Sequence, residues 1–135
     1  MHVRRQKNLV LILAREFASK LATPMQISDA EGTLVYFNEP AEEVLGFTFS
    51  EAGEMPAAEW EAMFATEHLD GRPMPLEEMP GGIAFTERRP AHGSFRIVGQ
   101  DGIRRTISVT AFPLFAHTAE FVGIVTIFWQ EDGSV

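Results

Sequence analysis

The apolar stretch at residues 121–129 most constrains what this chain can fold into. It reads Phe-Val-Gly-Ile-Val-Thr-Ile-Phe-Trp, and β-branched and aromatic residues of this kind favour a strand. Because successive side chains of a strand point to opposite faces, this strand is apolar on both faces. Other parts of the chain must therefore cover both sides of any sheet that contains it.

Short apolar segments separated by turn residues predict four more strands. In the segment at residues 104–112, Ile107, Val109 and Ala111 alternate with Ser and Thr, which is typical of a strand with one buried face. The four segments lie at residues 25–27, 34–37, 95–98 and 104–112. The predicted order is two strands, three small helices and three strands.

The second strand runs directly into a helix at Asn38. An Asn in this position can accept a hydrogen bond from a backbone N–H of the first helical turn, so we expect it to be the N-cap. Pro40 suits the first turn, and Gly46 can end the helix in the left-handed conformation. Two further helices are predicted at residues 57–64 and 76–88, the latter interrupted at residues 80–82.

The first 23 residues predict an amphipathic helix. No Gly or Pro interrupts them, and apolar residues recur at spacings of three and four, at Val10, Leu13 or Ala14, Phe17 and Leu21. Basic residues before an apolar run also resemble a signal peptide, but the run at residues 9–14 is shorter than a signal-peptide core or a membrane span. A helix this apolar needs cover on more than one side.

Charge and composition exclude several function classes. The 135-residue chain has a net charge of −8 and no Cys, so disulfides and thiolate chemistry are absent. An acidic protein is a poor nucleic-acid binder, because that affinity comes mainly from Lys and Arg at phosphates. Residues 1–20 are locally basic and can still contact an anionic partner.

No catalytic or metal-binding motif emerges from the sequence. Ser94 lacks the G-x-S-x-G elbow of a hydrolase nucleophile. Glu67, His68 and Asp70 cluster, but no further ligand follows at a recognisable spacing. We therefore predict a protein that is not an enzyme, with no catalytic residue and no metal site.

Four segments, taken in order, resemble a PAS domain. They are DAEGTLVYFNEPAEEVLGF, DGRPMPLEEMP, GQDGIRRTISVTAFPL and FVGIVTIFWQ, and the resemblance covers about residues 25–131. It implies an α+β fold with a five-stranded antiparallel sheet, short helices across one face and an internal pocket. The expected domains are a dimerisation helix at residues 1–23, a PAS domain at residues 24–132 and a tail at residues 133–135.

The resemblance also implies a set of pocket residues, although the same positions could equally form an ordinary core. The inward positions of the family map onto Val35, Phe37, Gly81, Gly82, Phe85, Phe95, Ile107, Val109 and Phe128. A pocket this apolar, with no charged anchor, suits a lipid-like or aromatic ligand better than a carboxylic metabolite.

Cofactors of the family can be tested against the residues present. Light-oxygen-voltage relatives need a Cys for their covalent flavin adduct, so that chemistry is excluded, while noncovalent flavin binding stays open. Haem-binding relatives commonly take a His from the third helix, and residues 76–89 contain none, so haem is not expected. The cofactor is left unknown.

The predicted function is a sensory or signal-relay module that binds a small apolar ligand or a protein partner. We expect a cytoplasmic homodimer that involves neither nucleic acid nor membrane, and whose output, with no helix after residue 129, passes to a separate signalling protein. The expected dimer interface comprises Leu9, Val10, Leu13, Phe17, Leu21, Val125, Ile127 and Trp129.

Two alternatives remain for comparison with the structure. One is a cone-shaped α+β enzyme of the ketosteroid isomerase type, which needs a carboxylate or His in its cavity. The other is a haem-binding gas or redox sensor.

Overall fold

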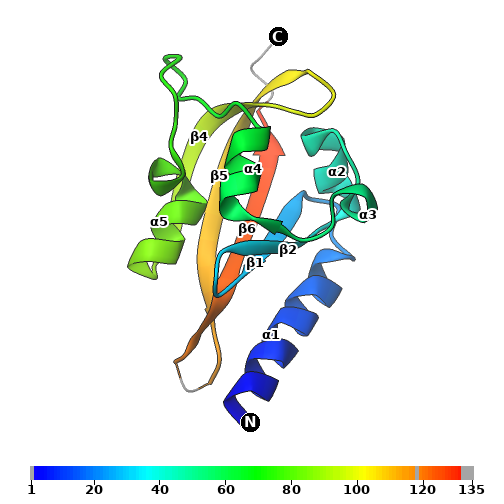
Figure 1. The fold of residues 1–135 in the computed structure, drawn as a ribbon, viewed down its shortest axis with the longest axis vertical. Helices are drawn as coiled ribbons and strands as arrows, with labels where there is room; N and C mark the ends of the chain where they lie inside the picture. Colours follow the sequence, from blue (N-terminus) through cyan, green and yellow to red (C-terminus); the bar gives the residue numbers. More distant parts are fainter. Residues whose placement is uncertain (1, 118, 132–135) are drawn as a thin grey trace.

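The computed structural model describes residues 2–117 and 119–131 and shows an α+β fold built on one antiparallel sheet (Figure 1). The strands are β1 (Met25–Asp29), β2 (Thr33–Phe37), β3 (Met55–Pro56), β4 (Ala91–Val98), β5 (Arg104–Phe115) and β6 (Phe121–Gln130). The helices are α1 (His2–Ala18), α2 (Glu39–Leu45), α3 (Phe49–Ala52), α4 (Ala57–Met63), the 3-10 helix η1 (Leu76–Glu78) and α5 (Pro80–Glu87). The predicted tail at residues 133–135 lies outside the described residues.

The sheet has the strand order β3-β2-β1-β6-β5-β4, so the two chain-terminal hairpins meet at the centre where β1 pairs with β6. The prediction of an α+β fold is confirmed, but the prediction of five strands is wrong. The sixth strand is β3, whose two residues pair with Thr33 and Leu34 of β2. So short a segment, with a Pro that is tolerated only at a sheet edge, carries no strand signal in the sequence.

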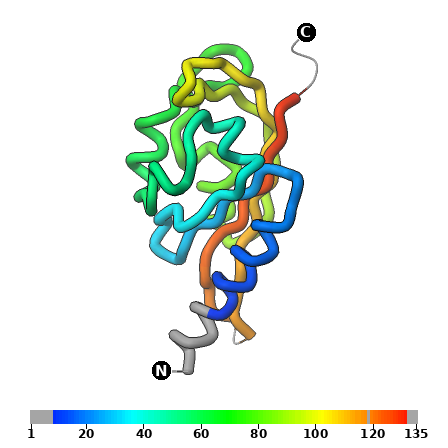
Figure 2. The backbone as a smooth tube through the Cα atoms, turned by 90° about the vertical axis from the view of Figure 1, so that its right-hand side faces the viewer, coloured from blue at the N-terminus to red at the C-terminus, as the bar shows by residue number. Residues whose placement is uncertain are grey.

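The sheet separates two unequal layers. Helices α2 to α5 cover one face, and α1 lies against the other (Figures 1 and 2). The larger core lies under the short helices and includes Phe37, Leu45 and Phe64, each 1% exposed or less. A smaller core under α1 includes Met25, Ile27 and Val125. Both faces of β6 are therefore covered over most of its length, as its composition requires.

The N-terminal helix packs on the outer face of the sheet with one of its sides and leaves another side exposed. Leu11, Ala14, Ala18 and Leu21 pack on the outer core, whereas Leu13 and Phe17 are each 58% exposed. The small side chains of the two alanines allow the helix to approach β1 and β6 closely. The guanidinium of Arg15 lies 4.6 Å from the centre of the Tyr36 ring, and this cation–π contact adds to the packing of α1 on the sheet.

The corner between β2 and α2 forms as predicted. The Asn38 side chain accepts a hydrogen bond from the Ala41 N–H, a Pro occupies the first turn, and Gly46 caps the C-terminus with φ at 85°. An added Cβ on Gly46 would lie 2.6 Å from the Asp101 backbone nitrogen, so glycine is needed here for space as well. Asn38 does more than cap, because its Nδ2 donates to the carbonyls of Ala18 and Thr23, both at 2.9 Å.

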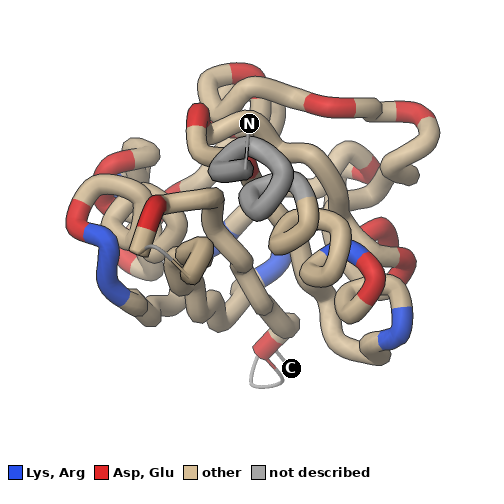
Figure 3. Tube along the Cα trace, turned by 90° about the horizontal axis from the view of Figure 1, so that it is seen from below, with Lys and Arg blue, Asp and Glu red and all other residues tan. Residues whose placement is uncertain are grey.

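Acidic residues are spread around the fold, and basic residues occupy few positions (Figure 3). This distribution agrees with the net charge of −8. Within the described part of the chain, no helix combines the length and the apolar character needed to cross a bilayer.

Candidate functional site

A cavity of about 390 Å³ lies between the sheet and the short helices. This volume falls within the range of roughly 300–1,000 Å³ typical of small-molecule sites. Strands β1, β2, β4, β5 and β6 form one wall, and α4, η1 and α5 form the other. Most lining side chains are apolar, so the cavity favours a ligand with a large apolar surface.

Seven of the nine predicted pocket residues line this cavity. They are Gly81, Gly82, Phe85, Phe95, Ile107, Val109 and Phe128. The structure thus brings these positions from α5, β4, β5 and β6 together around one space. Whether they hold a ligand there stays a prediction.

Val35 and Phe37 do not line the cavity, which corrects their predicted placement. Strict alternation in β2 would put both on the same face, but the register against β1 shifts between Ile27, opposite Tyr36, and Ser28, opposite Leu34. This bulge leaves Val35 as the extra residue, and Val35 packs on the outer core instead. Phe37 does face the inner core, where its ring lies 5.4 Å from that of Phe47, beside the cavity.

The two glycines of α5 serve different purposes. A Cβ on Gly82 would lie 2.0 Å from the Leu76 carbonyl oxygen, so only glycine lets α5 pack directly against η1. A Cβ on Gly81 would meet only the Thr126 hydroxyl, at 3.8 Å, which is an ordinary contact. Gly82 is therefore required by the backbone, whereas Gly81 leaves space on the cavity wall.

The mouth of the cavity is marked by its exposed lining residues, Glu31, Glu77 and Thr86. The ring of Phe85 lies against Gly32, 3.7 Å from where a Cβ would be, so this ring stands at the same opening. Among the described residues that line the cavity, the only charged ones are the two glutamates. The mouth is acidic and therefore disfavours an anionic ligand.

Polar side chains on the sheet wall were missed by the sequence analysis. Gln26 and Ser28 of β1 line the cavity, and Thr126 of β6, directly opposite Gln26, does so too. Alternation with Met25 and Ile27, which face the outer core, could have placed Gln26 inward. Trp60 of α4 also lines the cavity and could be found only from the packing of α4.

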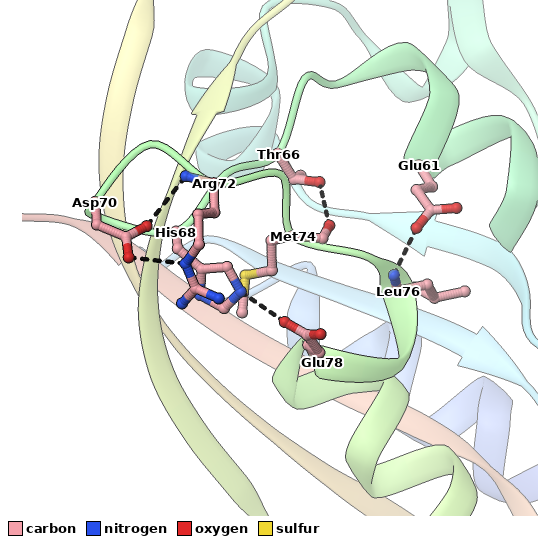
Figure 4. A network of polar contacts seen from close by, with 8 residues as sticks. All are labelled: Glu61, Thr66, His68, Asp70, Arg72, Met74, Leu76 and Glu78. Atoms are coloured by element: carbon pink, nitrogen blue, oxygen red, sulfur yellow. Dashed lines mark hydrogen bonds and ion pairs between the residues drawn. The ribbon is translucent and has the colours of Figure 1, made fainter.

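The connector between α4 and η1 is held by a polar network that fixes the helical wall (Figure 4). The Leu76 N–H donates to Glu61 Oε2 at 2.5 Å, which ties the start of η1 to α4. Thr66 Oγ1 donates to the Met74 carbonyl at 2.9 Å. His68 Nε2 and Glu78 Oε1 are 2.6 Å apart. The wall formed by η1 is thus braced at both ends.

The cavity offers no acid–base pair or metal ligand set in the part of the chain that the structure describes. No His lines it there, and its two glutamates lie at the exposed mouth. Among the described residues, no group of three or more His, Cys, Asp or Glu could hold a metal ion. Neither the isomerase alternative nor the haem alternative gains an observation in its favour.

The predicted dimer residues divide into two groups. Val125 and Ile127 are covered by α1 of the same chain, and Leu21 packs on the same outer core just after α1 ends. Val10 is half-buried, and the remaining four stay exposed to between 43% and 58%: Leu9, Leu13, Phe17 and Trp129. Leu9, Leu13 and Phe17 recur every four residues, so they form one stripe along α1, which we call the α1 stripe.

Beyond α1, the outer face of the sheet is polar around Trp129. Glu131 Oε2 accepts hydrogen bonds from Ser94 Oγ at 2.5 Å and Ser108 Oγ at 2.6 Å. The hydrogen bond from Ser108 makes the largest contribution, and that from Ser94 the next, to holding the pKa of the Glu131 carboxyl below its ordinary value. The end of β6 is thereby tied to both β4 and β5.

Comparison with solved structures decides the fold. The chain superposes on a PAS domain from Colwellia psychrerythraea with a TM-score of 0.65 and 17% identity, covering 90% of this chain and 97% of that one. The fold is that of a PAS domain. A PAS domain of Bordetella pertussis BvgS gives a TM-score of 0.63 at 17% identity, covering 93% and 88% of the two chains.

A LOV protein from Rhodobacter sphaeroides matches at a TM-score of 0.67 and 12% identity, covering 99% of this chain and 70% of that one. This match to the PAS fold extends over nearly the whole chain. No protein-family model and no curated protein matches the sequence. At these identities the similarity shows the fold, and the residues of the cavity must carry the argument about function.

Proposed function

We propose that this protein is a sensory module that binds a small, predominantly apolar molecule in the cavity and relays binding through a homodimer contact on α1. The observation that carries this proposal is the cavity itself, about 390 Å³ with mostly apolar walls, which lies between the sheet and the short helices. A core without a function would be packed closely, since interiors hold few voids larger than a water molecule. Sensory PAS and LOV domains among the structural matches support the same reading.

The α1 stripe supports the dimeric part of the proposal. Leu9, Leu13 and Phe17 leave an apolar strip on a helix whose other side already packs on its own sheet. A second copy of the chain offers the same strip, and a twofold contact would cover both. Trp129 lies on the same side of the sheet and would adjoin such a contact. The partner that receives the signal would be a separate signalling protein. A cytoplasmic location stays a prediction from the sequence.

The experiment that tests ligand binding uses protein purified from its native host. We expect denaturing extraction and mass spectrometry to release one small apolar compound at close to one per cavity. We also expect an absorption spectrum without haem or flavin bands, because no His lines the described cavity and its acidic mouth disfavours the phosphate of a flavin nucleotide. Stoichiometric haem or flavin would contradict the proposed ligand class.

A Phe85→Ala variant provides the control for the site. The Phe85 ring stands at the mouth, so its removal should open the cavity and lower ligand recovery several-fold without unfolding the protein. An equal amount of ligand in wild type and variant would show that the compound binds elsewhere.

A further inference from the structure

Thr126 carries the only hydroxyl in the otherwise apolar stretch at residues 121–129. It lies in β6, at the centre of the sheet, and lines the cavity on the same face as Ile124 and Phe128. Valine has a similar shape, and both β-branched residues favour strands, so packing alone does not explain a threonine here. The hydroxyl at this position needs another explanation.

The Thr126 hydroxyl is directed from the sheet toward the helical wall. Outside the backbone of α5, its oxygen is the nearest atom to the position that a Cβ of Gly81 would take, at 3.8 Å. Gly81 also lines the cavity, and because it has no side chain, the space between β6 and α5 stays open at this point. The hydroxyl therefore stands at the inner wall, where a molecule in the cavity can reach it.

This hydroxyl is unpaired, in contrast to the other buried polar side chains. The described chain buries four of them, at Asn38, Thr66, Ser108 and Thr126. The first three form hydrogen bonds within the fold, whereas the Thr126 hydroxyl has no hydrogen-bond partner in the part of the chain that the structure describes. Gln26 Oε1 is both unpaired and inaccessible to solvent, but the Thr126 hydroxyl keeps accessible surface. Since buried polar groups are nearly always hydrogen-bonded, this one is available to a ligand.

The surroundings of Thr126 restrict the group that can pair with it. A hydroxyl can donate or accept, so the ligand group can be a hydroxyl, a carbonyl or an N–H. An ion would lose its hydration and gain only one neutral partner, which is costly. The only charged residues among the described lining, Glu31 and Glu77, lie at the exposed mouth. The group that meets Thr126 should therefore be uncharged.

We propose that Thr126 determines the ligand specificity of the cavity, because its hydroxyl forms a hydrogen bond with an uncharged hydroxyl, carbonyl or N–H group of a mainly apolar ligand in the space beside Gly81. This inference rests on the proposed function, since it concerns the same cavity. It goes beyond apolar binding by naming the residue that selects the ligand and the group that is selected.

Three bicyclic probes test this selection. Naphthalene has no hydrogen-bonding group, and 1-naphthol and 2-naphthol add an uncharged hydroxyl at two different positions of the same ring system. We expect at least one naphthol to bind about three- to tenfold more tightly than naphthalene, as one net hydrogen bond provides. Titration calorimetry on the full chain gives the three dissociation constants.

Two variants assign the preference to the Thr126 side chain. Thr126→Val removes the hydroxyl and keeps the shape, so it should bind naphthalene and the preferred naphthol equally to within about twofold, with naphthalene affinity unchanged to the same extent. Thr126→Ser keeps the hydroxyl and should retain the preference for the naphthol. Circular dichroism shows whether both variants are folded.

Stability without ligand separates a binding role from a structural one. Thr126→Val removes a hydroxyl that the described fold does not satisfy, so the refolded, ligand-free variant should be at least as stable as wild type. Thr66→Val is the matched control, because the Thr66 hydroxyl donates to the Met74 carbonyl and its loss should lower the urea midpoint by about 0.5 M or more. A Thr126→Val variant as destabilised as Thr66→Val would show that the hydroxyl supports the fold, and would overturn the proposal.

The outcomes distinguish this inference from the proposed function. Equal binding of all three probes to wild type, as would follow if only water meets the hydroxyl, overturns the role of Thr126 and leaves the proposed function standing. A preference for a naphthol that persists in Thr126→Val also overturns that role alone. Failure of all three probes to bind overturns both the role of Thr126 and the binding of small apolar molecules in this cavity.

Discussion

Replacing Asn38 by Ala should destabilise this protein far more than the loss of a helix cap. The side chain is 1% exposed and forms four hydrogen bonds to backbone groups. Its Oδ1 accepts from the Met25 N–H at 3.0 Å and the Ala41 N–H at 3.1 Å. Its Nδ2 donates to the Ala18 and Thr23 carbonyls, both at 2.9 Å. One residue thus joins the end of α1, the linker, β1 and α2.

The magnitude follows from the groups that lose their partner. The Ala18 carbonyl also accepts from the Leu21 N–H, at 3.1 Å, and keeps that bond in the variant. The Thr23 carbonyl and the N–H groups of Met25 and Ala41 lose the bond that Asn38 supplies. A buried unpaired group costs about 1–3 kcal/mol, and partial relaxation lowers the sum, so we expect a loss of about 3–5 kcal/mol. A cap alone would cost about 1 kcal/mol.

Urea denaturation followed by circular dichroism measures the difference. For a slope of about 2 kcal/mol per molar urea, the midpoint should fall by about 1.5–2.5 M. Thr48→Ala is the matched control, because Thr48 caps α3 with a capping box at a more exposed site and should cost about 1 kcal/mol or less. Asn38→Asp keeps Oδ1 but turns an oxygen toward the two carbonyls, so it should also be strongly destabilising. If Asn38→Ala costs no more than Thr48→Ala, Asn38 is only a cap and the reasoning fails.

Three further predictions address the α5 glycines, the α1 stripe and the end of β6. Gly82→Ala should lower the denaturation midpoint strongly because its Cβ meets the η1 backbone, whereas Gly81→Ala should leave the midpoint unchanged or slightly raised, and equal effects would contradict this. Leu13→Glu combined with Phe17→Glu should convert a dimer to a folded monomer in sedimentation, because both side chains are exposed in the single chain; a wild type that is already monomeric refutes the contact. The lowered pKa of Glu131 means that its carboxylate stabilises the fold above its unfolded pKa, near 4.5, and that this contribution is lost as pH falls through the folded value. Glu131→Gln should therefore flatten the fall in stability as the pH drops below about 4.5, and an unchanged slope would show that the carboxylate contributes nothing.

The elements with strong local signals could be predicted from the sequence. The corner at Asn38 and Gly46 follows from capping chemistry, which depends on residues within one turn. The composition of β6 predicted that both of its faces are buried, and α1 covers the outer face as this prediction required. The order of the elements, with the segments that resemble PAS domains, gave the fold.

The errors arose where tertiary contacts decide the outcome. The bulge opposite Ile27 and Ser28 shifts the phase of β2, and nothing local in the run of apolar residues around Val35 marks it. The sequence pattern left Leu13 and Ala14 as alternatives for the inward position of α1, and the structure places Ala14 on the sheet, where the small side chains of Ala14 and Ala18 allow the helix to approach closely. In both cases the apolar residues were identified, and only their direction required the structure.

Strand β1 connects the cavity with α1 in a way that constrains how a signal could travel. Gln26 and Ser28 line the cavity, while Met25 and Ile27, which alternate with them, pack against α1 on the opposite face. The Asn38 side chain links the start of the same strand to the end of α1. A ligand changes the position or dimerisation of α1 only to the extent that it binds two arrangements of this strand with different affinity. Contact with the β1 residues of the cavity wall can provide such a difference because it acts on β1 directly, whereas contact with the edge strand β4 would add affinity with little effect on α1. The part of the ligand that contacts β1 would then carry the signal, and the rest of the ligand would supply most of the binding.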